Sequence, residues 1–215
     1  MVTPKIRAMT TTRSKSLLLV ALIAWVVFSS PASAESATVQ NCTWCHGSSA
    51  QGYTPAPRLA GQRQAYLEQQ LLSFKAHTRD NPASKQYMWG AAANLPANLV
   101  HDLATYFATL PPKPANDGRS ELVALGEAIY QRGMPDDNVV ACVACHGPNA
   151  EGIAAIPRLN GLAYTYLKRR LEEWAAGYDA AAKHPMPSVA RKLSSAQIDA
   201  LASYLSFGTH IEARQ

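Results

Sequence analysis

Two short cysteine motifs, placed one hundred residues apart, constrain what this chain of 215 residues can fold into. They read Cys42-Thr-Trp-Cys45-His46 and Cys142-Val-Ala-Cys145-His146, and they use all four cysteines of the sequence. This spacing is typical of c-type haem attachment, because two thiols three positions apart can bond the two vinyl groups of one haem while the adjacent histidine lies under the iron. The motifs therefore predict two covalently bound haem c groups, with Cys42, Cys45, Cys142 and Cys145 as attachment points and His46 and His146 as proximal iron ligands.

Two other uses of the cysteine pairs fit less well. A zinc ribbon usually separates its two pairs by about 15–20 residues, whereas Cys45 and Cys142 are 97 positions apart. A thioredoxin-like redox pair needs a strand–helix setting, and the residues that flank each motif show no strand pattern. Haem attachment remains the interpretation that explains both motifs together.

The surroundings of the two motifs also match. Residues 42–76 and 142–176 align without a gap at an offset of 100, and 14 of the 35 positions are identical. That period is longer than the roughly 20–50 residues of a solenoid repeat, so it indicates a duplicated domain. A proline-rich segment separates the copies and favours an extended spacer. We expect a first repeat at 35–110, a linker at 111–118 and a second repeat at 119–215, each folded around its own haem.

The apolar residues follow a helical period throughout. A helix is predicted over Gln62–Ala76, because the apolar side chains there fall on one stripe. Each repeat also ends in a predicted helix with one apolar face, around Leu99–Leu110 and Ile198–Leu205. Ser194 and Gln197 resemble a capping box at the start of the last helix. Because no useful segment alternates with period two, the predicted fold class is all-α.

Two methionines occupy equivalent places before the last helix of each repeat. Met88 and Met186 follow their haem histidines by 42 and 40 residues. A thioether opposite histidine favours ferrous iron and raises the reduction potential. We predict Met88 and Met186 as the sixth ligands, and we expect Met134, which has no counterpart, to serve in packing. No competing histidine is repeated, so we expect these residues at the surface: His77, His101, His184 and His210.

A Pro-Arg-Leu turn is also repeated, at Pro57-Arg58-Leu59 and Pro157-Arg158-Leu159. A carbonyl near Pro57 or Pro157 is placed to accept the second N–H of the proximal histidine, which would fix the ring. Arg58 and Arg158 are suited to neutralise haem propionates. The alternative is an ordinary turn that precedes a helix.

The N-terminus has the layout of a secretory signal peptide. A basic segment is followed by the apolar run Leu17–Phe28 and by Ala32-Ser33-Ala34. An uncleaved anchor is the alternative, but twelve apolar residues are short against the roughly 20 of a membrane span. We expect residues 1–34 to be removed and the mature chain to work in the periplasm. Cleavage lowers the formal net charge from +5 to +1 by removing Lys5, Arg7, Arg13 and Lys15, which argues against nucleic-acid binding.

Taken together, these motifs resemble the tandem di-haem class I cytochromes c of the cytochrome c4 type. The features that match are the Cys-x-x-Cys-His-Gly motif, the Pro-Arg-Leu-x-Gly turn with its Tyr-Leu helix, and a methionine before a leucine-rich last helix, each present twice. The resemblance implies two cytochrome c folds packed face to face, His/Met-ligated iron in each, and a periplasmic electron carrier rather than an enzyme. Its implied partners are redox proteins: a respiratory or dehydrogenase donor and an acceptor such as a terminal oxidase.

Two further functions stay open. The chain also fits a cytochrome subunit of a larger redox complex, associated peripherally with a membrane assembly. A small di-haem oxidoreductase is the other alternative, and it requires one iron with an open or displaceable sixth position.

The first repeat departs from the family pattern at its start. Only Glu35–Asn41 precede Cys42 in the expected mature chain, whereas the second repeat has a candidate helix at Glu121–Gln131 with Gly126 and Tyr130 placed to meet the last helix. We therefore expect Tyr106 and Phe107 to lack cover, and the first haem domain to be more open there.

Overall fold

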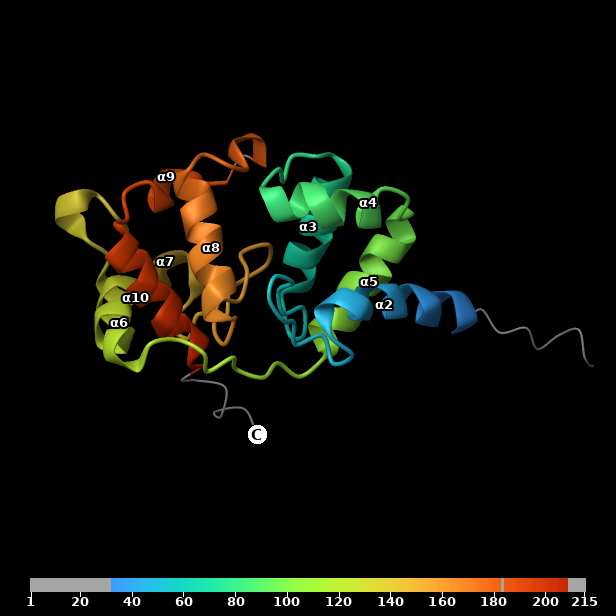
Figure 1. Cartoon of the computed structure of the whole chain (residues 1–215), viewed down its shortest axis with the longest axis horizontal. Helices are drawn as coiled ribbons and strands as arrows, with labels where there is room; N and C mark the ends of the chain where they lie inside the picture. The colour runs from blue at the N-terminus through green and yellow to red at the C-terminus, as the bar shows by residue number, and fades with distance from the viewer. Residues whose placement is uncertain (1–31, 183, 209–215) are drawn as a thin grey trace, which may run out of the picture. The chain divides into compact units, whose positions relative to one another are not determined.

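The structure is a computed structural model that describes residues 32–182 and 184–208 (Figure 1). Most of the predicted signal peptide lies outside the described residues, as does His210. The described residues from 38 onward form one compact unit that contains both repeats, and the described residues before 38 belong to a separate unit. The described residues are helical, with only isolated bridges such as Tyr53–Ala56 and Ile153–Ile156. The all-α prediction is confirmed.

The first repeat is built from four α-helices and one turn of π-helix. Its core joins α3 to α5 through Leu67, Leu103 and Phe107, with Val39 packed against them. The elements are α2 (Ala32–His46), α3 (Gln64–Lys75), the π-helix Ser84–Met88, α4 (Trp89–Ala92) and α5 (Ala97–Thr109).

In the second repeat an additional helix, α6, precedes the attachment motif, and the core is larger. Buried residues of α6, α8 and α10 meet there, among them Tyr130, Leu167 and Leu201. The α-helices are α6 (Val123–Arg132), α7 (Val143–His146), α8 (Tyr164–Ala175), α9 (Met186–Ala190) and α10 (Ser195–Ser206), and short 3₁₀ turns lie at Ser120–Leu122, Pro135–Asp137 and Ala180–Ala182.

The last helix of the second repeat is held by α6. Gly126 lies so close to α10 that a Cβ atom there would be 2.1 Å from the Ala200 carbonyl oxygen. Four residues on, the ring of Tyr130 lies 5.6 Å from that of Tyr204. Ser194 and Gln197 form the predicted capping box at the start of α10. Both sequence predictions for this helix are confirmed.

The last helix of the first repeat differs partly from expectation. Phe107 is only 4% exposed, because it points into the core formed by α3 and α5, so the expectation that it lacks cover is wrong. Tyr106 is 38% exposed, as expected. Asp102 and Thr105 stand where α10 has Ala200 and Ser203, and both are exposed. The face that α6 covers in the second repeat is therefore polar in α5.

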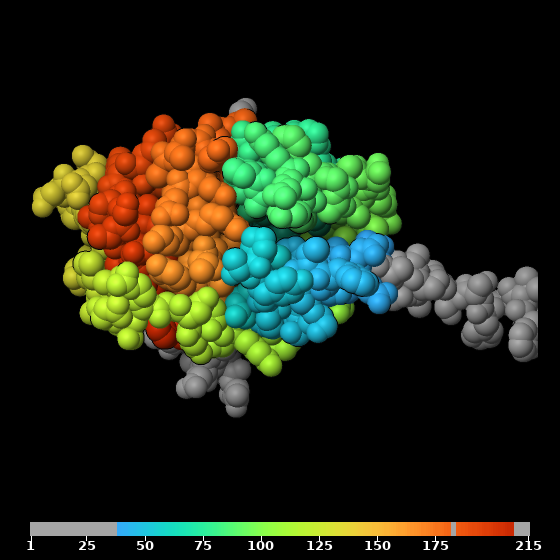
Figure 2. Space-filling view, viewed as in Figure 1, coloured from blue at the N-terminus to red at the C-terminus, as the bar shows by residue number. Residues whose placement is uncertain are grey.

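Polar contacts join the two repeats within residues 38–215, and Figure 2 shows their side chains in contact along a continuous seam. The side-chain amide of Gln62 pairs with the backbone of Arg158 in both directions, at 2.9 and 2.7 Å. Arg63 Nε donates to the Gly152 carbonyl at 2.9 Å. The linker between the repeats is held too, since Ala115 N donates to Gly161 O and Asn116 N to Ser206 O.

Candidate haem sites

The helices place the three residues of each attachment motif together. Cys42, Cys45 and His46 lie in the last turns of α2, where positions i, i+3 and i+4 share one face. In the second repeat, Cys142 caps α7, which ends at His146. None of the four cysteines forms a disulfide. Among the described residues there is no cluster of three or more His, Cys, Asp or Glu side chains that could hold a metal ion.

The attachment cysteines have unlike surroundings within each pair. Cys42 and Cys142 are half-buried, whereas Cys45 and Cys145 are exposed. Burial raises the pKa of the Cys42 thiol and raises that of Cys142 to about 11. An apolar environment of this kind suits a thioether bond to a haem vinyl group, which carries no charge. In each pair, one cysteine faces the interior and the other lies at the surface.

Both motif histidines make the same hydrogen bond. His46 Nδ1 lies 2.7 Å from the Pro57 carbonyl oxygen, and His146 Nδ1 lies 3.0 Å from that of Pro157. The bond fixes the ring and leaves Nε2 as the nitrogen available to iron. Burial lowers the pKa of both imidazoles, so they are neutral at pH 7, the form that binds a metal.

In each repeat, a glycine allows the Pro-Arg-Leu turn to lie close to the motif histidine. Gly52 N and Gly152 N each donate to the carbonyl of the motif histidine at 2.8 Å. Both glycines have positive φ, +70° and +67°, and a Cβ on either would approach the Pro-Arg backbone to below 3 Å. Any other residue would push the turn away from the histidine.

The two methionines occupy matching but not identical positions. Met88 ends the π-helix Ser84–Met88, and Met186 begins α9. Both are half-buried, and Met186 packs against the core of the second repeat. Met134 also packs against that core, as expected of a residue without a counterpart.

The other described histidines have partners of their own. His101 pairs with Glu68 at 2.8 Å, and His77 stacks on Trp89 at 3.9 Å between ring centroids. Both are exposed, as expected. His184 is half-buried instead, because its ring packs edge-on against Trp174 at 5.5 Å.

The two repeated arginines are buried to different degrees. Arg158 is 7% exposed and donates to three backbone carbonyls, those of Ala60, Gly61 and Asn160. Burial and the nearby charge of Arg58 lower the pKa of Arg158 to about 10. Neither arginine forms a salt bridge with a described carboxylate, and Arg58 Nε is buried without a partner. Burial lowers the pKa of the half-buried Arg58 as well, and the nearby charge of Asp117 partly opposes that effect. One buried and one half-buried positive charge, neither in a salt bridge among the described residues, suit an anionic group such as the haem propionates.

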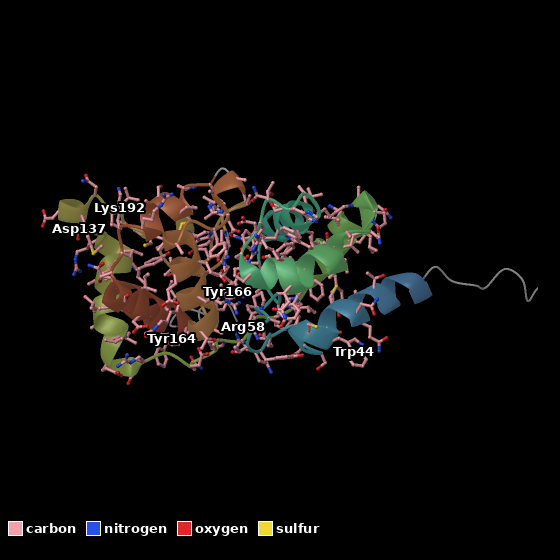
Figure 3. The ribbon with its side chains drawn as sticks, turned by 45° about the horizontal axis from the view of Figure 1, so that its top comes forward. Trp44, Arg58, Asp137, Tyr164, Tyr166 and Lys192 are labelled. Carbon is pink, nitrogen blue, oxygen red and sulfur yellow. The ribbon has the colours of Figure 1, made fainter. Side chains whose placement is uncertain are left out.

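Sequence reasoning missed the polar residues between the repeats. Figure 3 shows Arg58 and Tyr166 in the crowded middle of the unit, whereas Trp44 points outward from α2. Arg79 is buried, and its guanidinium donates to Gln70 at 2.6 Å and to Tyr166 at 3.4 Å. Two features of the sequence point to these contacts: the identity of Tyr66 with Tyr166, and Gln70 as the polar exception on an otherwise apolar helical stripe.

The family model for cytochrome c matches residues 33–111 and 123–207. This chain belongs to the cytochrome c family. It is 32% identical to cytochrome c-552 of Acidithiobacillus ferridurans over 196 residues, covering 90% of this chain and 84% of the relative. It is 35% identical to cytochrome c4 of Pseudomonas aeruginosa over 189 residues, covering 83% and 89%. A relative from Thiomonas intermedia, named thiosulfate dehydrogenase electron acceptor, is 34% identical over 202 residues, covering 89% and 90%.

Solved structures agree with these relatives. Cytochrome c4 of Acidithiobacillus ferrooxidans superposes with a TM-score of 0.73 at 32% identity, covering 78% of this chain and 99% of the other. Reduced cytochrome c4 of Pseudomonas stutzeri gives 0.71 at 29% identity, covering 85% and 100%. The chain is thus a di-haem electron carrier of the cytochrome c4 type, with two covalent haem c groups, and not an enzyme.

Proposed function

We propose that the protein is exported, loses residues 1–34, and carries electrons in the periplasm between a donor dehydrogenase and a terminal oxidase. The iron of the first haem is held by His46 and Met88, and that of the second by His146 and Met186. Arg58 and Arg158 neutralise the haem propionates. The observation that carries this proposal is the repeated bond from each motif histidine to a proline carbonyl, at 2.7 and 3.0 Å.

Six-coordinate iron suits a carrier because no position is left for a substrate. The protein then supplies only burial, ligands and charge, which set the reduction potentials. The predicted boundaries, 35–110, 111–118 and 119–215, assign one such iron to each repeat. No described helix is long and apolar enough to span a bilayer.

The names of relatives support the donor class and link this family to terminal oxidases. Two are named thiosulfate dehydrogenase electron acceptors, from Thiomonas intermedia and Stutzerimonas stutzeri, at 34% and 36% identity. Another is named as the CcoP subunit of a cbb3-type oxidase, at 27% identity over 58% of that protein. We therefore propose a dehydrogenase of the thiosulfate-oxidising type as donor and a haem–copper oxidase as acceptor.

The test uses the haem-loaded protein purified from the periplasm. Its mass should equal that of residues 35–215 plus two haems. Thiosulfate with a thiosulfate dehydrogenase should reduce both haems, and membranes that contain a terminal oxidase should reoxidise them in air. A control without dehydrogenase should stay oxidised. A protein that neither accepts nor delivers electrons would contradict the proposal, and stable co-purification with a larger complex would favour the subunit alternative.

A further inference from the structure

Asp179 is a buried carboxylate that receives hydrogen bonds from both repeats. Its side chain is 1% exposed. Oδ1 accepts the backbone N–H groups of Asp80 and Asn81, at 2.8 and 3.2 Å. Oδ2 accepts the guanidinium of Arg170 and, at 3.2 Å, the indole N–H of Trp174. The one carboxylate therefore ties two backbone groups of the first repeat to two side chains of the second.

The first-repeat partners lead directly to Met88. Asn81 O accepts from Lys85 N at 3.1 Å, and Ser84 Oγ donates to Asn81 Oδ1, so Asn81 holds the start of the π-helix that ends at Met88. At the other end, Trp89 Nε1 donates to the Arg79 carbonyl at 2.9 Å. Residues 84–89, which include Met88, are thus hydrogen-bonded at both ends to residues 79–81. Two backbone N–H groups of residues 79–81 in turn donate to Asp179.

The second-repeat partners lead to Met186. Asp179 N donates to Asp80 Oδ1 at 2.7 Å, which makes the contact reciprocal. Asp179 starts the segment that reaches Met186 seven residues later. Trp174, which donates to Asp179, also packs edge-on against His184, two residues before Met186. Through Trp174, the residue two positions before Met186 is therefore linked to the same carboxylate.

We propose that Asp179 is a positioning residue for the sixth ligand of both haems, in its own repeat and in the other. This inference rests on the proposed ligation by Met88 and Met186. Removing the charge leaves two buried N–H groups with a weaker acceptor and Arg170 with only Glu173 as its carboxylate partner at 2.6 Å. Both methionine loops then lose the same anchor, so a substitution of Asp179 should change the ligation of both haems, whereas loss of one methionine leaves the anchor and the other ligand in place.

The test is Asp179→Asn in the haem-loaded protein, read by proton NMR of the reduced state. Each iron-bound methionine gives a strongly shifted methyl signal, and Met88→Ala and Met186→Ala assign the two. We expect both signals to weaken or disappear in Asp179→Asn, with a fall in both reduction potentials and carbon monoxide binding at both haems. Loss of the Met186 signal alone, or no change in either, would overturn the inference. A missing signal in the unmodified protein would refute the proposed ligation instead.

Three further variants separate positioning from general stability. Asp199→Asn removes a carboxylate that pairs with Lys168 at 2.6 Å and Tyr164 at 2.7 Å inside the second repeat only. It should leave both methyl signals in place. If Asp179→Asn fails to fold, Asp80→Ala decides, because this side chain is 42% exposed. Its removal strips the reciprocal acceptor of Asp179 N together with an exposed ion pair to Lys85 at 3.9 Å. The matched variant Lys85→Ala removes only that ion pair and should leave both methyl signals in place. In Asp80→Ala both signals should weaken, and unchanged signals there would overturn the inference.

Discussion

The last helices of the two repeats, α5 and α10, come from matching stretches of sequence but lie in different surroundings. Tyr204 in α10 is 6% exposed beneath α6, whereas the matching Tyr106 in α5 is 38% exposed. Yet both repeats hold their motif histidine by the same bond to a proline carbonyl. The comparison shows that the geometry around the proximal histidine does not depend on how closely the last helix is covered.

The largest expected difference is in the free energy of unfolding, between variants of the matching tyrosines Tyr204 and Tyr106. Tyr204→Ala removes a buried ring from the second core and should cost about 4 kcal/mol of unfolding free energy. Tyr106→Ala should cost about 1 kcal/mol, because much of that ring already contacts water. Urea unfolding of the haem-loaded variants measures both values. Equal losses would show that α5 is covered in solution as fully as α10.

The contact between α6 and α10 can be tested at Gly126. Gly126→Ala places a methyl group 2.1 Å from the Ala200 carbonyl oxygen and should destabilise the second repeat by about 3 kcal/mol. The control is Gly90→Ala in α4, where a Cβ meets nothing within 4 Å. That variant should be neutral or more stable by up to about 1 kcal/mol, since alanine favours helix. If the two variants melt alike, the close approach of α6 is wrong.

The two repeated arginines, Arg58 and Arg158, should differ in their effect on the haem potentials. Arg158→Leu removes a positive charge from a poorly solvated place and should lower a haem potential by about 60 mV, a tenfold change in the redox equilibrium. Arg58→Leu should have a smaller effect, because that side chain is only half-buried. Spectroelectrochemical titration measures both shifts. Arg158→Lys keeps the positive charge, so its haem reduction potential should stay close to that of the unmodified protein. A fall as large as that in Arg158→Leu would contradict a charge effect.

The smallest effect concerns the exposed faces beside the attachment motifs. Trp44 lies between Cys42 and Cys45 and is 75% exposed, whereas the matching position in the second repeat is Ala144. If partners dock against the first haem there, Trp44→Ala should slow electron exchange about fivefold, the size of a modest interface contact. Stopped-flow mixing with the donor provides the rate. Ile153→Ala, on an exposed site of the second repeat, should leave the rate nearly unchanged, and a larger effect there would move the docking face.

Much of each repeat was predictable because the same motifs occur in both copies of the sequence. The attachment cysteines, the Pro-Arg turn and the capping box at Ser194 follow from local spacing, and the structure shows the expected helices and the His–Pro bonds. The expectation that Phe107 lacks cover failed, because Phe107 is buried in the core of α3 and α5, against which Val39 of α2 also packs, and the short stretch before Cys42 did not reveal these neighbours. Local patterns describe a repeat well because its contacts are close in sequence.

Contacts between the repeats were not predictable from the duplication. Gln62 pairs with the backbone of Arg158, but its own counterpart is Leu162, so the pair breaks the repeat. Asp80 and Asp179 match at an offset of 99, inside loops where the spacing drifts from 100 to 98. Residues that are identical in the two repeats indicate contacts made within each repeat. A contact between the repeats joins two different residues, so the duplication does not reveal it.

Carbon monoxide binding to the fully reduced, haem-loaded protein is the most direct test of the central claim, that both irons carry a methionine sixth ligand. The visible spectrum of the unmodified protein should not change when the gas is added. Met88→Ala and Met186→Ala should each bind carbon monoxide at one haem, and the double variant at both. A spectral shift in the unmodified protein, or single variants that bind none, would contradict the account.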